Sequence, residues 1–446
     1  MKMKKIILLF MCFVFLFISC SQQKETKETK EVKETNPLFA IVQDGKWGFI
    51  DKTGKIVINP QFDLVFPFEE GLSGVMIGGK WGFIDKTGKF IINPQFDNIP
   101  FFYEGLSGVM IDYKWGLIDK TGKFIINPKF DGEGYFSEGL CDVKIGYKYG
   151  YIDKTGKVII NTQFDGAKKF SEGLASVNIG GKWGFVDKTG KIIINPQFDV
   201  ADDFMEGIAR VNIGGKWGFI DKTGKIIINP QFDGAYKFSE GLASVNIGAT
   251  KNKYGVAQGG KWGYIDKTGK IIINPQFDVA ADFMEGIARV NIGGKWGFID
   301  KTGKVIINTQ FDDAGFFSEG LTYVNIGATK NKHGIVQGGR CGFIDKTGKV
   351  IINPQFDEVG RFSEGLASVR IGATKAEWYS YRGGKWGYID KTGKIIINPQ
   401  FDGADDFMEG IARVNIGATV KGYGSTQGGK YGFIDKTGKY VWNPTN

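Results

Sequence analysis

The residue types that most often carry out chemistry are scarce in this chain of 446 residues. Histidine occurs once, at His333, and cysteine occurs four times. Neither a Ser-His-Asp nor a Cys-His arrangement can be built around a single histidine. A zinc site fails for the same reason, since it needs His and Cys ligands at short spacing. This inventory predicts no metal site and no cofactor.

Carboxylates are abundant, but they belong to repeated sets. Two of these sets are represented by Asp51, Asp85 and Asp119 and by Glu70, Glu104 and Glu172. A glycosidase needs two carboxyl groups in one cleft, with surroundings that separate their pKa values. Equivalent residues in equivalent surroundings do not provide that difference. We therefore predict that the protein is not an enzyme and has no catalytic residues.

Cys341 is the cysteine whose neighbour could activate it. Arg340 precedes it, and a cationic neighbour lowers the pKa of a thiol. The favoured interpretation is a tolerated packing substitution, because equivalent positions of the chain usually hold Trp. Cys141 lies many repeats away, which argues against a disulfide between the two.

The positions equivalent to Cys341 reveal the organisation of the chain. They are Trp47, Trp81, Trp115, Tyr149, Trp183, Trp217, Trp262, Trp296, Cys341, Trp386 and Tyr431. Successive positions are 34 residues apart, except for four gaps of 45 residues. Each longer gap carries an insertion of 11 residues at the same point of the repeat. A fixed period of this length indicates a tandem-repeat fold.

Each repeat predicts three strands. A Trp-Gly strand, KWGFID, ends in an Asp-Lys-Thr-Gly turn and is followed by an aliphatic strand, KIIIN. The continuous β-branched run predicts burial on both faces, and the following Pro should end the strand. A connector with two aromatics, such as Phe62 and Phe68, then leads through Glu-Gly to an alternating strand, LASVNI. Gly48, between Trp47 and Phe49, indicates a bulge or a close approach of another chain segment.

The phase of the repeat defines its limits. Leu38–Lys46 matches Leu174–Lys182 in pattern, so the array begins with the alternating strand and ends with the aliphatic strand. Residues 38–446 then hold eleven complete three-stranded antiparallel meanders. We interpret the Trp positions as core packing, with an aromatic groove for sugars as the alternative.

The recurring KWGFIDKTGK phrase resembles the bacterial WG-repeat family, also called KWG repeats, over about residues 38–446. This resemblance implies an all-β repeat protein with no assigned enzymatic activity and no catalytic residues to transfer. We expect an open, solenoid-like or superhelical stack, because such an array accepts any number of units. One or two β-propellers are the alternative, although propellers typically have four to eight blades of four strands.

The first 37 residues have a different composition. Residues 1–19 combine a Lys-rich start with an apolar run too short for a confident membrane span, and they resemble a bacterial lipoprotein signal that ends before Cys20. We predict lipidation of Cys20, with residues 20–37 as a Lys/Glu-rich tether. Removing three lysines with the signal lowers the net charge from +9 to +6, a weak basic excess that does not indicate nucleic acid. The predicted location is the bacterial envelope, at the outer membrane or cell surface, with the inner membrane as the alternative.

Two surfaces vary from unit to unit. The first is the polar row of the alternating strands, which includes Arg210, Arg289, Arg370 and Arg413 and is expected to project away from the core. The second is the set of insertions at 249–258, 328–337, 373–382 and 418–427, which should protrude from one edge. Their candidate binding residues are Tyr254, His333, Trp378, Tyr379, Tyr381, Arg382 and Tyr423. A solvated face and harmless longer hairpins are the alternatives.

These features lead to a hypothesis of function. The protein would be a lipid-anchored, non-enzymatic envelope protein that binds another protein or an envelope glycan or polymer through repeated contacts. A structural spacer or adhesive surface protein is the alternative, and a carbohydrate-binding module is a further one. The sequence leaves the oligomeric state open.

Overall fold

The computed structural model describes residues 37–99, 101–251, 257–330, 336–375, 381–420 and 426–445. These residues belong to one compact unit, Leu38–Asn446. The predicted signal segment, nearly all of the tether, and Cys20 lie outside the described residues. No helix among the described residues is long and apolar enough to cross a membrane.

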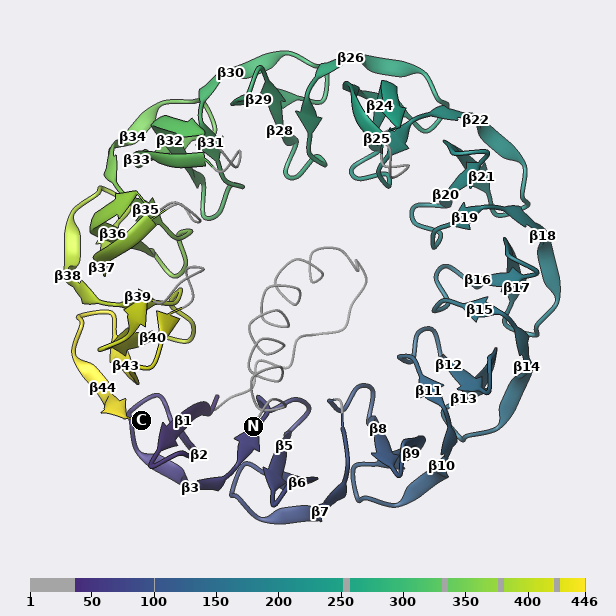
Figure 1. Ribbon diagram of the computed structural model, residues 1–446, viewed down its shortest axis with the longest axis horizontal. Helices are drawn as coiled ribbons and strands as arrows, with labels where there is room; N and C mark the ends of the chain where they lie inside the picture. Colours follow the sequence, from purple (N-terminus) through teal and green to yellow (C-terminus); the bar gives the residue numbers. More distant parts are fainter. Residues whose placement is uncertain are drawn as a thin grey trace. The chain divides into compact units, whose positions relative to one another are not determined.

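The unit consists of eleven small antiparallel sheets, which follow one another around a ring (Figure 1). In each sheet, here called a blade, the alternating strand pairs with the Trp-Gly strand, which pairs with the aliphatic strand. Blade 1 holds β1–β3 and blade 2 holds β4–β7, and the numbering continues to blade 11, which ends with β44. The prediction of an all-β fold with eleven three-stranded units is confirmed.

The alternating strands are the first long strands of the blades. They are β1 (Phe39–Gln43), β5 (Leu72–Ile77), β8 (Leu106–Ile111), β12 (Leu140–Ile145), β16 (Leu174–Ile179), β20 (Ile208–Ile213), β24 (Leu242–Lys251), β28 (Ile287–Ile292), β32 (Leu321–Lys330), β36 (Leu366–Lys375) and β40 (Ile411–Ile416). The Trp-Gly strands are β2 (Lys46–Ile50), β6 (Lys80–Asp85), β9 (Lys114–Asp119), β13 (Lys148–Asp153), β17 (Lys182–Asp187), β21 (Lys216–Asp221), β25 (Ala257–Asp266), β29 (Lys295–Asp300), β33 (Val336–Asp345), β37 (Tyr381–Asp390) and β43 (Lys430–Asp435).

The aliphatic strands lie on the outside of the ring (Figure 1). They are β3 (Ile56–Phe62), β7 (Phe90–Phe96), β10 (Phe124–Phe130), β14 (Val158–Phe164), β18 (Ile192–Phe198), β22 (Ile226–Phe232), β26 (Ile271–Phe277), β30 (Val305–Phe311), β34 (Val350–Phe356), β38 (Ile395–Phe401) and β44 (Tyr440–Thr445). Nine blades gain a two-residue strand from the connector: β4 (Leu64–Val65), β11 (Gly132–Glu133), β15 (Gly166–Ala167), β19 (Val200–Ala201), β23 (Gly234–Ala235), β27 (Val279–Ala280), β31 (Asp313–Ala314), β35 (Glu358–Val359) and β39 (Gly403–Ala404). β41 (Thr419–Val420) and β42 (Thr426–Gln427) form a separate hairpin.

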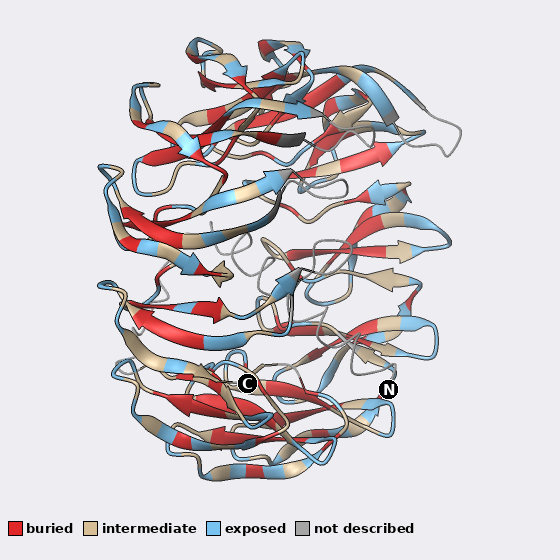
Figure 2. Cartoon of the chain, turned by 60° about the vertical axis from the view of Figure 1, so that its left-hand side comes forward, coloured by how far each residue is buried: buried red, intermediate tan, exposed pale blue. Residues whose placement is uncertain are grey.

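The hydrophobic core is divided among the interfaces between blades (Figure 2). Between blades 5 and 6, Leu174, Phe185 and Ile194 of one blade pack against Ala209 and Ile220 of the next, all at most 8% exposed. A single blade buries little by itself, so it needs a neighbour on each face. Phe62, at the end of β3, and Phe68 of the connector are both buried in one such interface.

The prediction for the aliphatic strand was wrong in two respects. In β18 only Ile194 of the three successive isoleucines is buried, and Ile192 is 41% exposed. The strand also continues through Pro196 to Phe198. Both differences follow from its place at the outer edge of the blade, where one strand edge has no partner and Pro is tolerated. A register shift opposite Gly184 accommodates the Pro, and a Cβ on Gly184 would lie 2.4 Å from the Ile194 carbonyl oxygen, as the predicted close approach requires.

Two polar clasps join successive blades. At the hairpin end, Asp63 accepts hydrogen bonds from Lys46 Nζ of blade 1 (2.7 Å) and from the Gly78 backbone N–H of blade 2 (2.7 Å). At the opposite end, Glu172 of blade 5 accepts from the Gly207 N–H of blade 6 (3.0 Å) and pairs with Lys222 of that blade (3.1 Å). Equivalent ion pairs recur around the ring, so the carboxylates equivalent to Asp63 and those equivalent to Glu172 are structural.

The ring closes by direct contact of blade 1 with blade 11. Phe39, Ile41 and Ile50 of blade 1 form a core cluster with Ile411 and Phe433 of blade 11. The Thr445 hydroxyl of blade 11 also donates a hydrogen bond to the Val42 carbonyl oxygen of blade 1. These contacts select the alternative of a single propeller over the open stack that we favoured. The open stack was expected because eleven three-stranded units exceed the usual blade number, but narrow blades allow more of them around one ring.

The seam between blades 1 and 11 differs from the other junctions in a way that the sequence encodes. Phe39 occupies the position that is Ala209 in blade 6, and its ring lies 5.7 Å from that of Phe433. At the junction of blades 5 and 6 the corresponding ring contact comes from the connector, where Phe204 lies 4.8 Å from Phe185. The seam has no connector among the described residues, so Phe39 provides the missing ring.

Candidate functional site

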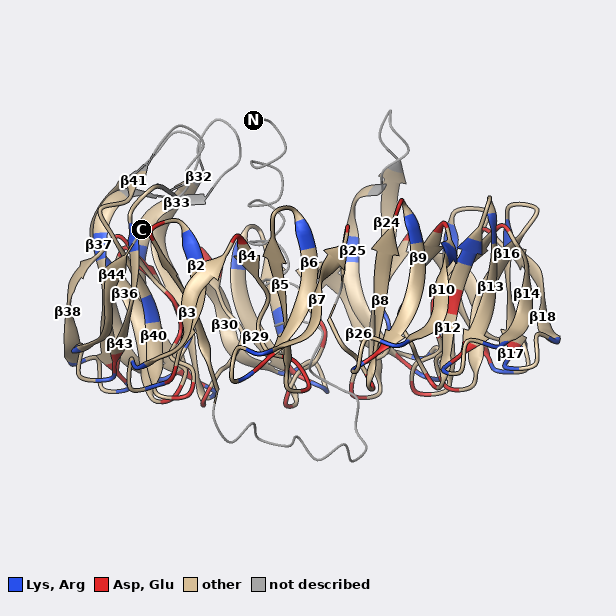
Figure 3. Cartoon of the chain, turned by 90° about the horizontal axis from the view of Figure 1, so that it is seen from below, with Lys and Arg blue, Asp and Glu red and all other residues tan. Residues whose placement is uncertain are grey.

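The extended hairpins are the main departure from the regular ring. In blade 7 the pairing of β24 with β25 continues from Ile247↔Lys261 through Ala249↔Gly259 to Lys251↔Ala257. Blades 9 and 10 repeat this extension, and blade 11 forms the separate β41–β42 ladder instead. Figure 3 shows β24 rising above the neighbouring strands at one edge of the ring. The prediction that the insertions protrude from one edge therefore agrees with the described parts of these hairpins.

The candidate residues in these hairpins fall mostly at their tips. Tyr254, His333, Trp378, Tyr379 and Tyr423 lie outside the described residues. Tyr381 and Arg382 belong to β37, where they pair with Lys375 and Thr374. Their role in binding stays a prediction.

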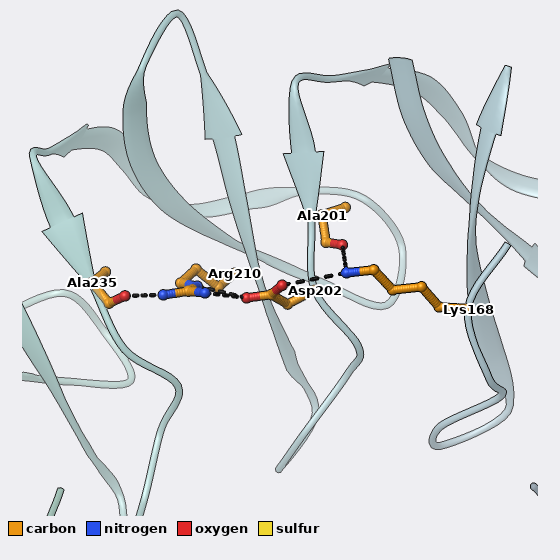
Figure 4. Close-up of polar contacts among 5 residues, drawn as sticks. All are labelled: Lys168, Ala201, Asp202, Arg210 and Ala235. Carbon is orange, nitrogen blue, oxygen red and sulfur yellow. Dashed lines mark hydrogen bonds and ion pairs between the residues drawn. The ribbon is translucent and has the colours of Figure 1, made fainter. Parts of the chain in front are cut away.

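Three of the four arginines in the row, Arg210, Arg289 and Arg370, do not have the exposed placement that we expected. The Arg210 side chain is 22% exposed and pairs with Asp202 at 2.5 Å. Its guanidinium also donates to the Ala235 carbonyl oxygen of blade 7, as Figure 4 shows. On the other side, Lys168 of blade 5 donates to the Ala201 carbonyl oxygen (2.9 Å) and approaches Asp202 (3.5 Å). These side chains link blades 5, 6 and 7 rather than forming an open polar stripe.

The other three arginines have related partners. Arg289 donates to the Ala314 carbonyl oxygen of the next blade, and burial lowers its pKa. Arg370 is 12% exposed and pairs with Glu358 at 2.6 Å. Arg413 is 46% exposed and pairs with Asp405 at 2.8 Å. Arg210 and Arg289 therefore bridge to the next blade, whereas Arg370 and Arg413 pair within their own blade. The binding role of all four stays a prediction.

One large side chain covers the aromatic of the Trp-Gly strand in several blades. In blade 6 it is Arg210, whose guanidinium lies 4.1 Å from the Trp217 ring centroid. In blade 2 it is Phe66 from the connector, stacked on Trp81 at 4.6 Å, while the residue equivalent to Arg210 is Gly74. The Trp side chains are thus buried or half-buried between blades, in agreement with a packing role.

Cys341 follows the same packing rule. It is 5% exposed, and Tyr323 of its own blade packs against the cluster that contains it. Burial raises the pKa of the Cys341 thiol to about 12. Arg340 pairs with Asp357 instead of activating the thiol. The reactive-thiol alternative is therefore not supported. Cys141 and Cys341 are both buried, and neither is part of a disulfide.

The described residues contain no group of three or more His, Cys, Asp or Glu side chains that could hold a metal ion. Asp142 has a raised pKa of about 6, because its carboxyl group is buried. It occupies the position of Arg210 in blade 4, where Tyr149 replaces Trp.

The sequence analysis missed two tyrosines in short hairpins. Tyr113 and Tyr147 are 86% and 89% exposed, whereas Gly79 and Gly181 occupy their position in blades 2 and 5. The available signal was the replacement of the second Gly of this turn by Tyr in blades 3 and 4, which becomes informative once these turns are known to share one edge.

The solved structures that match this chain are only remotely similar to it. A eukaryotic initiation factor is 10% identical, with a TM-score of 0.43, covering 92% of this chain and 96% of that chain. PorZ, a surface component of the type-IX secretion system of Porphyromonas gingivalis, is 11% identical, with a TM-score of 0.24, 90% coverage of this chain and 65% of its own. Hsv2 of Kluyveromyces lactis is 11% identical, with a TM-score of 0.29, covering 60% of this chain and 93% of its own. A search of curated protein sequences finds no match.

The repeat itself matches a family model, described as WG containing repeat, over ten segments. They are 47–81, 81–115, 115–149, 149–183, 183–217, 217–254, 262–296, 296–328, 342–373 and 386–418. Each segment runs from one Trp-Gly strand to the next alternating strand or beyond, so it joins parts of two adjacent blades. These matches span most of the ring, and the chain therefore belongs to the WG-containing repeat family.

Proposed function

We propose that this protein is a lipid-anchored, non-enzymatic binding protein of the bacterial envelope. Its ring would act as a rigid scaffold, and its extended hairpins would contact another protein or an envelope polymer. The observation that carries this proposal is the common edge of the four extensions in blades 7, 9, 10 and 11. Three of these blades are consecutive, so their tips can contact one ligand together.

The paired bases of the hairpins support a binding role. In blade 10, ladder pairs continue through Ala373↔Gly383 and Thr374↔Arg382 to Lys375↔Tyr381. A paired base restricts the conformations of the tip before any ligand arrives, which lowers the entropy lost on binding. The clasp beneath it is also fixed, since the Ala373 N–H donates to Asp357 at 2.7 Å.

The composition of the tips suits recognition. The four insertions combine Lys or Arg with Tyr254, Trp378, Tyr379, Tyr381 and Tyr423. Aromatic and Arg side chains are enriched among the residues that dominate binding energy at interfaces. The insertion at 373–382 is the richest in them and is the preferred contact.

Deletion of 373–383 tests this proposal. It joins Gly372 to Gly384 and so restores the Gly-Gly turn of the short blades. The matched control deletes 249–259 in blade 7, which joins Gly248 to Gly260 in the same way. Pull-downs from envelope extract should recover a partner with the full-length chain and the control, but not with the 373–383 deletion. Equal recovery by all three would refute the role of this hairpin.

The spacer alternative is less well supported by a closed ring. A spacer gains reach with each added unit only if the array is open. In a ring, added units change the curvature and the closing seam instead. We therefore retain binding as the function that the geometry supports best.

A further inference from the structure

Tyr113 and Tyr147 are the most exposed large hydrophobic side chains of the described residues, at 86% and 89%. Tyr113 lies in the turn between β8 and β9, and Tyr147 lies in the equivalent turn between β12 and β13. These turns belong to the adjacent blades 3 and 4 and lie at the hairpin edge of the ring (Figure 3). Neither side chain has a hydrogen bond, ion pair or ring contact with any other described residue.

The backbone at Tyr113 is unfavourable for its residue type. Asp112 and Tyr113 have φ values of 50° and 61°, whereas Gly78 and Gly79 adopt this conformation in blade 2. Asp tolerates the left-handed region, but a bulky residue such as Tyr is rarely found there. Gly would form the same turn without strain, so the turn geometry does not explain Tyr113.

Most of the other non-glycine residues with positive φ make a contact between blades. Ten Glu residues of the connectors also have positive φ, for example Glu172 at 52°. The Glu172 carboxylate joins two blades through Gly207 and Lys222. By comparison, the Tyr113 side chain makes no hydrogen bond, ion pair or ring contact with the part of the chain that the structure describes. Backbone strain that no described intramolecular contact offsets is a reason to look for a contact with another molecule.

The surroundings of the two tyrosines are polar: a Lys–Asp ion pair lies next to each ring, and Asp112 adds one carboxylate beside Tyr113. Lys114, next to Tyr113, pairs with Asp131 at 2.5 Å. Lys148, next to Tyr147, pairs with Asp165 at 2.5 Å. Each pair offers hydrogen-bonding groups beside an exposed ring without adding net charge. This balance disfavours an anionic polymer, which would require unpaired cations.

A partner protein fits this surface less well than a sugar. Protein hot spots are central, desolvated pockets, whereas these rings stand among exposed ion pairs. A pyranose ring presents an apolar C–H face and a periphery of hydroxyl groups. An exposed aromatic ring flanked by Lys and Asp complements both parts.

We propose that Tyr113 and Tyr147 form a stacking platform for a neutral polysaccharide. Each ring would pack against the C–H face of one pyranose, with sugar hydroxyls bonded to the adjacent Lys–Asp pairs. Two equivalent rings on adjacent blades suit a ligand that is itself a repeat. This surface lies on blades 3 and 4, so the proposal stands even if the extended hairpins of blades 7 and 9–11 bind no partner.

The test uses affinity electrophoresis of the full-length chain in gels containing laminarin, xylan, galactomannan or dextran. The variant is Tyr113→Gly with Tyr147→Gly, which leaves Asp-Gly in blade 3, as at Asp44-Gly45 of blade 1, and Gly-Gly in blade 4, as at Gly78-Gly79 of blade 2. Both turns then have a sequence that the ring already uses, so the fold should be preserved. We expect retardation by at least one neutral polymer, weakened about fivefold by each substitution and on the order of twentyfold by both. Tyr103→Ser is the control: it removes a tyrosine that is 52% exposed in the blade 3 connector, where the blade 4 connector has Ser137. It should leave retardation unchanged.

A gain of function provides the second arm. Gly78→Asp with Gly79→Tyr adds an equivalent tyrosine to blade 2 and should increase retardation by the same polymer. The proposal is refuted if no neutral polymer retards the protein, if the double glycine variant is retarded equally, or if Tyr103→Ser abolishes retardation to the same extent. Retardation only by alginate or another anionic polymer would also refute it.

Discussion

Replacing Phe39 with Ala should open the ring at one place. Phe39 is 8% exposed and lies between Ile411, Phe433 and the rest of the seam cluster. Removing a ring that buries about 150–200 Å² of apolar area costs about 4 kcal/mol. This agrees with the roughly 3–5 kcal/mol measured for Phe→Ala in protein cores. The seam should therefore open about a thousand times more often.

The opening should remain local because the other junctions are held independently. Each of them keeps its own core cluster, and nine are joined by a Lys–Glu ion pair such as Lys222–Glu172. The equivalent residues at the seam, Lys52 and Glu409, are both described and form no ion pair. Opening therefore separates blade 1 from blade 11 without unfolding the blades between them.

Hydrogen exchange measured by mass spectrometry distinguishes local from global opening. In Phe39→Ala, amides of β1, β2, β43 and β44 should exchange about a thousandfold faster, while blades 4–8 keep their protection. Phe204→Ala is the matched control, since it removes an equally buried ring at the junction of blades 5 and 6. It should accelerate exchange near that junction and leave the seam protected. Uniform acceleration in Phe39→Ala, or no change at the seam, would show that the ring is not closed in this way.

Four further substitutions test separate parts of the argument. Arg210→Ala removes the Asp202 ion pair and the contact with Trp217, and should lower the free energy of unfolding by about 1–3 kcal/mol in urea titrations, with Arg210→Lys recovering part of the loss. Asp142 has a folded-state pKa of about 6, above the ordinary 3.8, so the folded state binds its proton more tightly and this group favours folding less as pH rises from about 4 to 6. Asp142→Asn should remove that contribution, so that its stability gain over the wild type grows by up to about 3 kcal/mol between pH 4 and pH 7, and a constant difference would contradict the assignment. Tyr113→Gly should stabilise the protein by about 1 kcal/mol through relief of backbone strain, seen as a higher Tm, and a lower Tm would show that the tyrosine does stabilise the turn. Cys20→Ser should move the protein from the membrane fraction to the soluble fraction and abolish labelling with a palmitate analogue, and continued labelling would exclude Cys20 as the lipidation site.

The alternating and Trp-Gly strands were predictable because their evidence is local. Gly48 illustrates this: its position between two large residues indicated a close approach, and its missing Cβ would lie 2.5 Å from the Ile58 carbonyl oxygen. The Asp51 turn is similarly self-contained, with Oδ1 accepting from the Thr53 N–H at 2.8 Å. Such interactions span a few residues, so the sequence of one repeat contains them completely.

The aliphatic strand and the arginine row were misjudged because their surroundings come from elsewhere in the chain. Three successive isoleucines in β18 predict full burial, but the strand lies at the outer edge of its blade, where Ile192 is exposed to solvent. Arg210 looks like a surface residue until blade 7 brings the Ala235 carbonyl oxygen to its guanidinium. Composition alone cannot say which face of a strand a neighbouring blade will cover.

The sequence by itself determined the number of units, their strand content, their phase and the edge from which the insertions protrude. The sequence pattern behind these properties recurs every 34 or 45 residues. It reflects contacts within one unit or between neighbouring units. Only the tertiary structure decided between a stack and a ring, because closure depends on a small rotation per blade summed over all eleven. It also placed Phe39 at the seam between blades 1 and 11, where its ring packs against Phe433. In the sequence, Phe39 is only a departure from the repeat pattern.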